Sequence, residues 1–211
     1  MEFRALLSLV GGEPIFETAL LLAGPAKPAI VQKQLVNWVR QGSIFQLRRG
    51  LYCLAPPYQK TRPHPFLVAN RLVRGSYVSL HSALAHYGLI PEYVAVVTSV
   101  GGGRPGRWRT PLGEFEARHV RPDLLWGYDL VAVAPDQNAF LARPEKALLD
   151  LVYLQPGGDD PAYLQELRLQ NLAQLDLNRL TEDAGRSRSP KLKRAAHTIA
   201  TLAAAETYEM L

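Results

Sequence analysis

The chain has 211 residues, of which 47% are apolar and 20% charged, and its net charge is +5. This composition excludes a chain that is disordered throughout, and the length fits one large domain or two small ones. The sequence holds no apolar run of the length, about 18 residues, that a membrane span needs. The N-terminus is a poor signal peptide and Cys53 is the lone cysteine, so we expect a reduced, cytoplasmic protein.

Positive charge is concentrated toward the N-terminus. Residues 1–62 hold eight Lys and Arg against three acids, residues 63–185 are net negative, and residues 186–211 are again net positive. No acid occurs between Glu17 and Glu92. This asymmetry favours a module that faces a polyanion, joined to a body with another role, and unevenly placed solubilising charge is the simpler alternative.

Helical spacing of apolar residues predicts three N-terminal helices, over residues 2–10, 15–23 and 28–41. The third has Pro28 in its first turn and Gly42 just past its end, which suit those positions. Its apolar stripe consists of Val31, Leu35, Trp38 and Val39. Five side chains that point away from this stripe can each donate hydrogen bonds to phosphates or base edges, and none of them is acidic: Lys33, Gln34, Asn37, Arg40 and Gln41.

The stretch "SIFQLRRGLYCLA", residues 43–55, predicts two strands joined by a tight turn at Arg48, Arg49 and Gly50. Three helices followed by a basic hairpin are typical of a winged helix-turn-helix, in which the third helix enters the major groove and the wing meets the backbone or minor groove. The predicted DNA-binding residues are Lys27, Lys33, Gln34, Asn37, Arg40, Arg48 and Arg49.

A proline-rich stretch, residues 55–65, predicts a boundary between a domain at 1–62 and another at 63–211. The second domain mixes helix and strand signals and ends in a helical tail, so the fold class is α+β. The predicted elements are a helix at 66–75, a short helix within 76–92, a strand at 93–100, a hairpin and strand at 101–120, a strand at 128–134, a helix at 143–154 and further helices beyond 160.

Three segments in series resemble the AbiEi family of antitoxin-type transcriptional regulators. They are the wing ending "QLRRGLYCLA", the segment "SYVSLHSALAHYGLIPE" and the helix "ARPEKALLDLVYL". The resemblance covers about residues 30–155, and beyond residue 160 it extends only to helical character. It implies that the N-terminal winged helix binds inverted repeats of double-stranded DNA in its own promoter and represses the operon.

The resemblance also implies a type IV antitoxin. Its C-terminal domain would neutralise a toxin similar to a nucleotidyltransferase, encoded next door, without forming a stable complex with it. Two other functions stay open: a winged-helix transcription factor whose body senses a ligand or partner, and a DNA-targeted nuclease or nucleotide-processing enzyme. The oligomeric state is also open, because a dimer or two monomers that assemble on DNA both fit an inverted repeat.

Candidate catalytic and metal sites are weak. Glu145 and Lys146 are adjacent on a predicted helix, so their side chains diverge by about 100°, unlike the carboxylate–lysine pair of a metal-dependent nuclease. A docked helix with an i,i+4 pair between Lys146 and Asp150 is favoured. His81 and His86 are off-phase for one helical face. We therefore predict no enzyme, no cofactor and no metal.

Two more basic segments are candidates for a secondary surface that binds nucleic acid or a partner, and plain solvated loops are the alternative. The "GGGRPGR" segment lacks the Lys-Ser/Thr ending of a phosphate-binding loop. The residues concerned are Arg104, Arg107, Trp108, Arg109, Arg186, Arg188, Lys191, Lys193 and Arg194.

Overall fold

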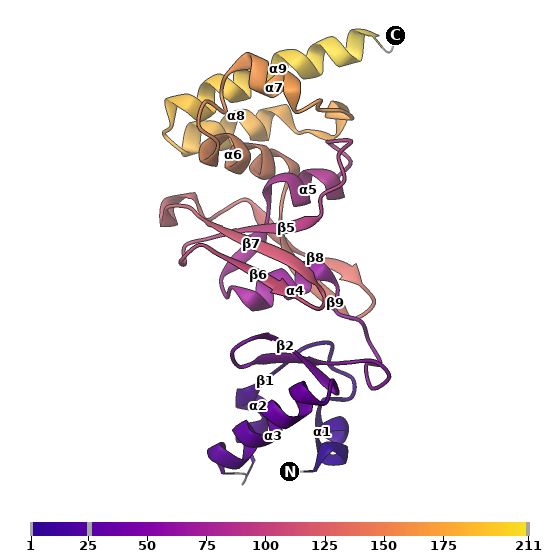
Figure 1. The fold of residues 1–211 in the computed structure, drawn as a ribbon. Coiled ribbons are helices and arrows are strands. Elements are labelled where there is room, and N and C mark those ends of the chain that lie inside the picture. The colour runs from indigo at the N-terminus through magenta and orange to yellow at the C-terminus, as the bar shows by residue number, and fades with distance from the viewer. Residues whose placement is uncertain (1, 25–26, 210–211) are drawn as a thin grey trace.

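The structure, a computed structural model, describes residues 2–24 and 27–209. Figure 1 shows three layers along the molecule: N-terminal helices with a small sheet, then a larger sheet, then C-terminal helices. The fold is mixed α+β, as predicted. We term the described residues up to 54 the head and those from 65 onward the body.

The head combines helices with short strands. Its elements are α1 (Phe3–Val10), β1 (Phe16–Glu17), α2 (Thr18–Leu22), α3 (Pro28–Arg40), β2 (Ile44–Arg48) and β3 (Leu51–Leu54). Strand β3 is central in a three-stranded antiparallel sheet, between β1 and β2. The helix predicted over 15–23 is wrong in its first part, because Phe16 and Glu17 pair with Tyr52 and Leu51 as strand β1.

Helix α3 begins at the predicted Pro28 and ends at Arg40, one residue before its predicted end, and it packs on the head through the predicted apolar stripe. Val31, Leu35 and Trp38 are buried against Leu6 and Ile44. Burial of one such side chain contributes about 1.5–3 kcal/mol. The stripe therefore fixes how α3 is rotated, and its opposite face points to solvent.

Strands β2 and β3 form the predicted hairpin. Gly50 in its turn has φ +80°, in the left-handed region that glycine tolerates at little cost. Ile44 and Leu54 belong to the head core, whereas Leu47 and Cys53 belong to the body core. The hairpin therefore joins the two cores, and burial raises the pKa of Cys53 to about 12, so its thiol stays neutral.

Residues 55–64, at the predicted boundary, form turns and extended coil before the body begins. The body elements are α4 (Pro65–Leu72), β4 (Ser76–Val78), α5 (Leu80–His86), β5 (Val96–Gly101), β6 (Gly106–Thr110), β7 (Gly113–His119), the 3-10 helix η1 (Pro122–Leu124), β8 (Tyr128–Ala134), β9 (Gln137–Ala142), α6 (Pro144–Leu154), α7 (Pro161–Glu166), the 3-10 helix η2 (Leu172–Gln174), α8 (Leu177–Arg186) and α9 (Pro190–Glu209). The strand predicted at 93–100 begins later, at Val96, and strands β4 and β9 were not predicted.

The body sheet has six strands in the order β6-β7-β5-β4-β9-β8. The pairs β4–β9 and β5–β7 are parallel and the others antiparallel. Helix α4 packs on β4 and β9, and its Val68 and Leu72 share a buried cluster with Leu47 and Leu51 of the hairpin. The head contacts the body through β2, which packs beside β6, and through a hydrogen bond from Arg48 to the carbonyl of Arg71 at the end of α4.

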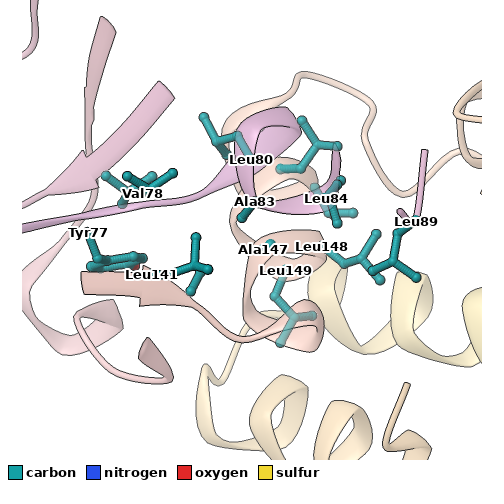
Figure 2. Close-up of a cluster of buried hydrophobic side chains, with 14 of the residues drawn as sticks. Tyr77, Val78, Leu80, Ala83, Leu84, Leu89, Leu141, Ala147, Leu148 and Leu149 are labelled. Atoms are coloured by element: carbon teal, nitrogen blue, oxygen red, sulfur yellow. The ribbon is translucent and has the colours of Figure 1, made fainter. Parts of the chain in front are cut away.

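The body core lies between the sheet and helices α5 and α6. Figure 2 shows Tyr77 and Val78 of β4 and Leu141 of β9 beside Ala83 of α5 and Leu149 of α6, all buried. Helix α6 matches its prediction, and its Lys146 and Asp150 form the predicted i,i+4 pair. Helices α7, α8 and α9 complete the layer beyond α6 (Figure 1).

Candidate nucleic-acid interface

The solvent-facing side of α3 carries three of the seven predicted DNA-binding residues. Lys33, Asn37 and Arg40 are exposed, and their i, i+4, i+7 spacing places them on one face. Lys27, just before the helix, is exposed, whereas Gln34 is half-buried at the edge of the face. Figure 1 shows α3 at the end of the molecule, away from the body sheet. The body therefore leaves this face open.

The region around α3 is positive because it has almost no acid to oppose its basic residues. From Thr18 to Pro91 the chain has nine Lys and Arg and no Asp or Glu. Glu17, the last acid before this stretch, forms an ion pair with Arg74 of the body. The exposed cations of α3 therefore favour an anionic partner, and a DNA duplex, with one negative charge per about 1.7 Å of its axis, is a charge-dense partner of this kind.

The two arginines of the hairpin turn lie in different environments. Arg49 is exposed at the tip. Arg48 is half-buried, and its guanidinium donates to the carbonyl oxygens of Arg71, at 3.2 Å, and of Arg49, at 3.1 Å. Arg71 lies in the last turn of α4, where carbonyls lack helical partners and attract cations. Arg48 therefore fastens the hairpin to the body, and Arg49 alone of this pair points outward.

The first predicted secondary surface has its charges largely matched. Arg107 and Arg109 on β6 form ion pairs with Glu116 and Glu114 of the neighbouring strand β7, at 2.9 and 2.7 Å. Trp108 is half-buried and packs on the body core, and Arg104 is exposed in the preceding turn. These arginines are cross-strand partners of carboxylates, which reduces the attraction of this surface for DNA.

The second predicted surface, on α8 and α9, is likewise used in part by internal contacts. Arg186 lies over the Trp126 ring, Lys191 donates to the carbonyls of Tyr153 and Gln155, and Arg194 forms an ion pair with Asp159 at 2.7 Å. Arg188 and Lys193 are exposed. This group lies at the opposite end of the molecule from α3 (Figure 1), so the structure does not bring it together with the head.

Lys146 and Asp150, weighed above for a nuclease site, take part in a buried polar network. The Asp150 carboxylate accepts hydrogen bonds from Tyr77 Oη at 2.9 Å, Ser79 Oγ at 2.8 Å and Lys146 Nζ at 2.5 Å. Burial raises the pKa of Asp150, and Lys146, Ser79 and Tyr77 counteract this rise. All four side chains are almost completely buried, so this network links β4 and the start of α5 to α6 and has no access to a large substrate.

Glu145, like Asp150, is buried and accepts a hydrogen bond from another part of the body. It is 1% exposed, and its Oε1 accepts a hydrogen bond at 2.8 Å from the backbone N–H of Asp176, just before α8. This bond attaches the segment before α8 to α6. The two carboxylates that raised the nuclease alternative therefore serve the packing of the body, which lowers the support for that alternative.

An open cleft of about 590 Å³ lies between the start of α4, helix α5 and the loop before β5. His64, His86, Glu92 and Tyr93 are among its lining residues. Burial lowers the pKa of His64 and of His86, so both imidazoles favour the neutral form. Within the described residues there is no cluster of three or more metal-ligating side chains, here or elsewhere.

Sequence reasoning overlooked two apolar residues on the open face of α3. Ile30 is 49% exposed and Val36 is 47% exposed. Both lie off the buried stripe and on the same side of the helix as Lys33. Helical spacing alone was sufficient to predict this position.

No helix within residues 2–24 and 27–209 is long and apolar enough to cross a membrane.

Comparisons with known proteins add the fold of one solved structure. No protein-family model and no curated protein matches the chain. The fold is similar to that in the crystal structure of the RV2827C protein from Mycobacterium tuberculosis, with a TM-score of 0.54 and 17% sequence identity. The similarity covers 93% of this chain and 75% of that chain. At this identity the likeness shows a shared fold alone.

Proposed function

We propose that the protein is a sequence-specific DNA-binding repressor whose head is a winged helix-turn-helix. The observation that carries the proposal is the open, acid-free face of α3, with Lys33, Asn37 and Arg40 exposed on one side. The element order α1-β1-α2-α3-β2-β3 is that of winged-helix proteins, with α3 in the position of the recognition helix. The exposed Arg49 at the hairpin tip fits a wing that contacts phosphates.

In this proposal the contacts have different roles. Lys33, Arg40 and Arg49 supply electrostatic attraction that is independent of sequence, and Asn37 forms hydrogen bonds with a base edge. Replacing Asn37 by alanine should cost about 1–3 kcal/mol of binding free energy on the operator and little on random DNA. Asn138, exposed on β9 in the body, offers the matched control variant Asn138→Ala.

The test is a mobility-shift titration of the full chain on its own promoter and on random DNA of the same length. The proposal would be supported if Asn37→Ala weakened binding to the promoter but not to random DNA, and if Asn138→Ala changed neither affinity. Absence of any preference of the wild-type protein for its promoter, or for another selected sequence, would refute sequence-specific repression.

We further propose that the protein is the antitoxin of a type IV pair and represses its own operon through inverted repeats. This part rests on the sequence resemblance to the AbiEi family. The partner would be a nucleotidyltransferase-like toxin, encoded next door, that forms no stable complex with the protein. Co-expression of the adjacent gene in a host, with and without this chain, tests it: rescue of growth is expected, and growth arrest that this chain does not relieve contradicts the proposal.

A transcription factor with a ligand-sensing body is the second candidate, favoured by the open cleft beside His64 and His86. A small molecule in the cleft would then change operator affinity. A thermal-shift screen of the full chain against small-molecule classes separates the antitoxin from the ligand-sensing transcription factor. A compound that stabilises the chain and also changes its affinity for the operator would favour the ligand-sensing function. An adjacent toxin gene that the chain neutralises would favour the antitoxin.

A further inference from the structure

The DNA-facing side of α3 has an apolar component that hydrogen bonding does not explain. At 100° per residue, Ile30 lies about 60° to one side of Lys33 and Val36 about 60° to the other. Ala29, Asn37 and Arg40 fall between them. The exposed face is therefore a basic and polar strip with a large β-branched side chain along each border, both about half exposed.

These two residues are poor choices for a helix face that contacts only water. Valine and isoleucine have lower helix propensity than the lysine, arginine or glutamine found elsewhere on α3, because the helix restricts their χ1 angle. Neither belongs to the buried stripe that holds α3 to the head. A contact outside the chain would explain their presence, and the charge of the surrounding face complements a polyanion.

The major groove offers one apolar group to such a side chain. Adenine, guanine and cytosine present donors and acceptors there, whereas thymine also presents its C5-methyl group. We propose that Ile30 and Val36 contact thymine methyl groups and so select thymine at operator positions next to those reached by Lys33 and Asn37. This inference rests on the proposed DNA binding, and it adds specificity residues that carry no hydrogen-bonding group.

The test removes the methyl group and leaves the base pair otherwise unchanged. In the operator found by the shift assay, each thymidine is replaced in turn by deoxyuridine, and affinity is measured for the wild-type protein, Ile30→Ala and Val36→Ala. The matched control is Leu9→Ala, because Leu9 is 48% exposed in the same head but lies on α1. Circular dichroism checks that each variant retains its helices.

We expect deoxyuridine to weaken wild-type binding roughly four-fold at one or more positions, the effect of losing one methyl contact. At such a position the penalty should vanish in Ile30→Ala or in Val36→Ala, and persist in Leu9→Ala. If the wild type binds its operator but every deoxyuridine is neutral, or if the penalties persist in both α3 variants, the inference is overturned and DNA binding stands. If no DNA sequence is preferred, both the inference and the proposed function fail.

Discussion

Replacing Arg49 and Arg48 separately should give different results, although the two residues are adjacent. Arg49 is exposed at the hairpin tip, whereas Arg48 donates to the carbonyl of Arg71 in the body. Each phosphate contact contributes about 0.9 to the slope of log affinity against log salt. Arg49→Ala should therefore lower the slope by about 0.9, which changes the affinity ratio between 50 and 200 mM salt by about 3.5-fold. Arg48→Ala should leave the slope nearly unchanged.

Arg48→Ala should instead lower the free energy of unfolding, because it removes a charged donor from the end of α4. We expect a loss of about 1–2 kcal/mol in a urea titration. The control for charge is Lys193→Ala, which removes one exposed positive side chain from α9, the helix at the opposite end of the molecule (Figure 1). An Arg49→Ala slope equal to that of the wild type would remove the wing from the interface. An equal slope change in both hairpin variants would show that Arg48 leaves Arg71 on DNA.

Three further predictions concern the body. Lys146→Met leaves the buried Asp150 without its cation, so it should lower the free energy of unfolding by about 3–5 kcal/mol. Lys193 is exposed, so Lys193→Met should change that free energy little. Similar urea midpoints for the two variants would contradict this prediction. Burial lowers the pKa of His81, so the unfolded chain binds its proton more readily than the folded one. Unfolding free energy should therefore fall as the pH drops below about 6.5, and His81→Gln should reduce that fall; equal pH profiles would refute it. Arg107→Ala with Arg109→Ala should not alter the salt slope of DNA binding, because both side chains already pair with Glu116 and Glu114; a lower slope would place β6 at the DNA.

Elements with a strong local pattern were predictable from the sequence. Helices α3 and α6 were predicted within a residue or two because their apolar repeats and proline starts agree. The β2–β3 hairpin was predicted because Gly50 marks its turn. Strands β1 and β4 have only two and three residues, too few to show an alternation, and they exist through pairing with distant chain segments. Tertiary pairing there overrides local propensity.

The candidate interface was predictable in part for a similar reason. The polar face of α3 follows from helical spacing, and so does the exposure of Ile30 and Val36. The environment of Arg48 could not be predicted from helical spacing, because the carbonyl that accepts its hydrogen bond belongs to Arg71, 23 positions away in another element. The burial of Glu145 was likewise hidden, since its partner, the N–H of Asp176, lies 31 positions along the chain.

The way the head sits on the body predicts that residues 1–62 alone fold poorly. In the full chain Leu47, Leu51 and Cys53 are at most 4% exposed, and all three belong to the body core. Exposing an aliphatic side chain such as Leu51 costs about 1.5–3 kcal/mol, so losing the body removes several kcal/mol from a head whose own core is small. The fragment should unfold at much lower urea concentration than the full chain, as followed by circular dichroism. A fragment with the stability and the operator affinity of the full chain would show that the head is an independent domain. The proposed DNA binding is therefore tested on the whole chain, in which the body core buries Leu47, Leu51 and Cys53.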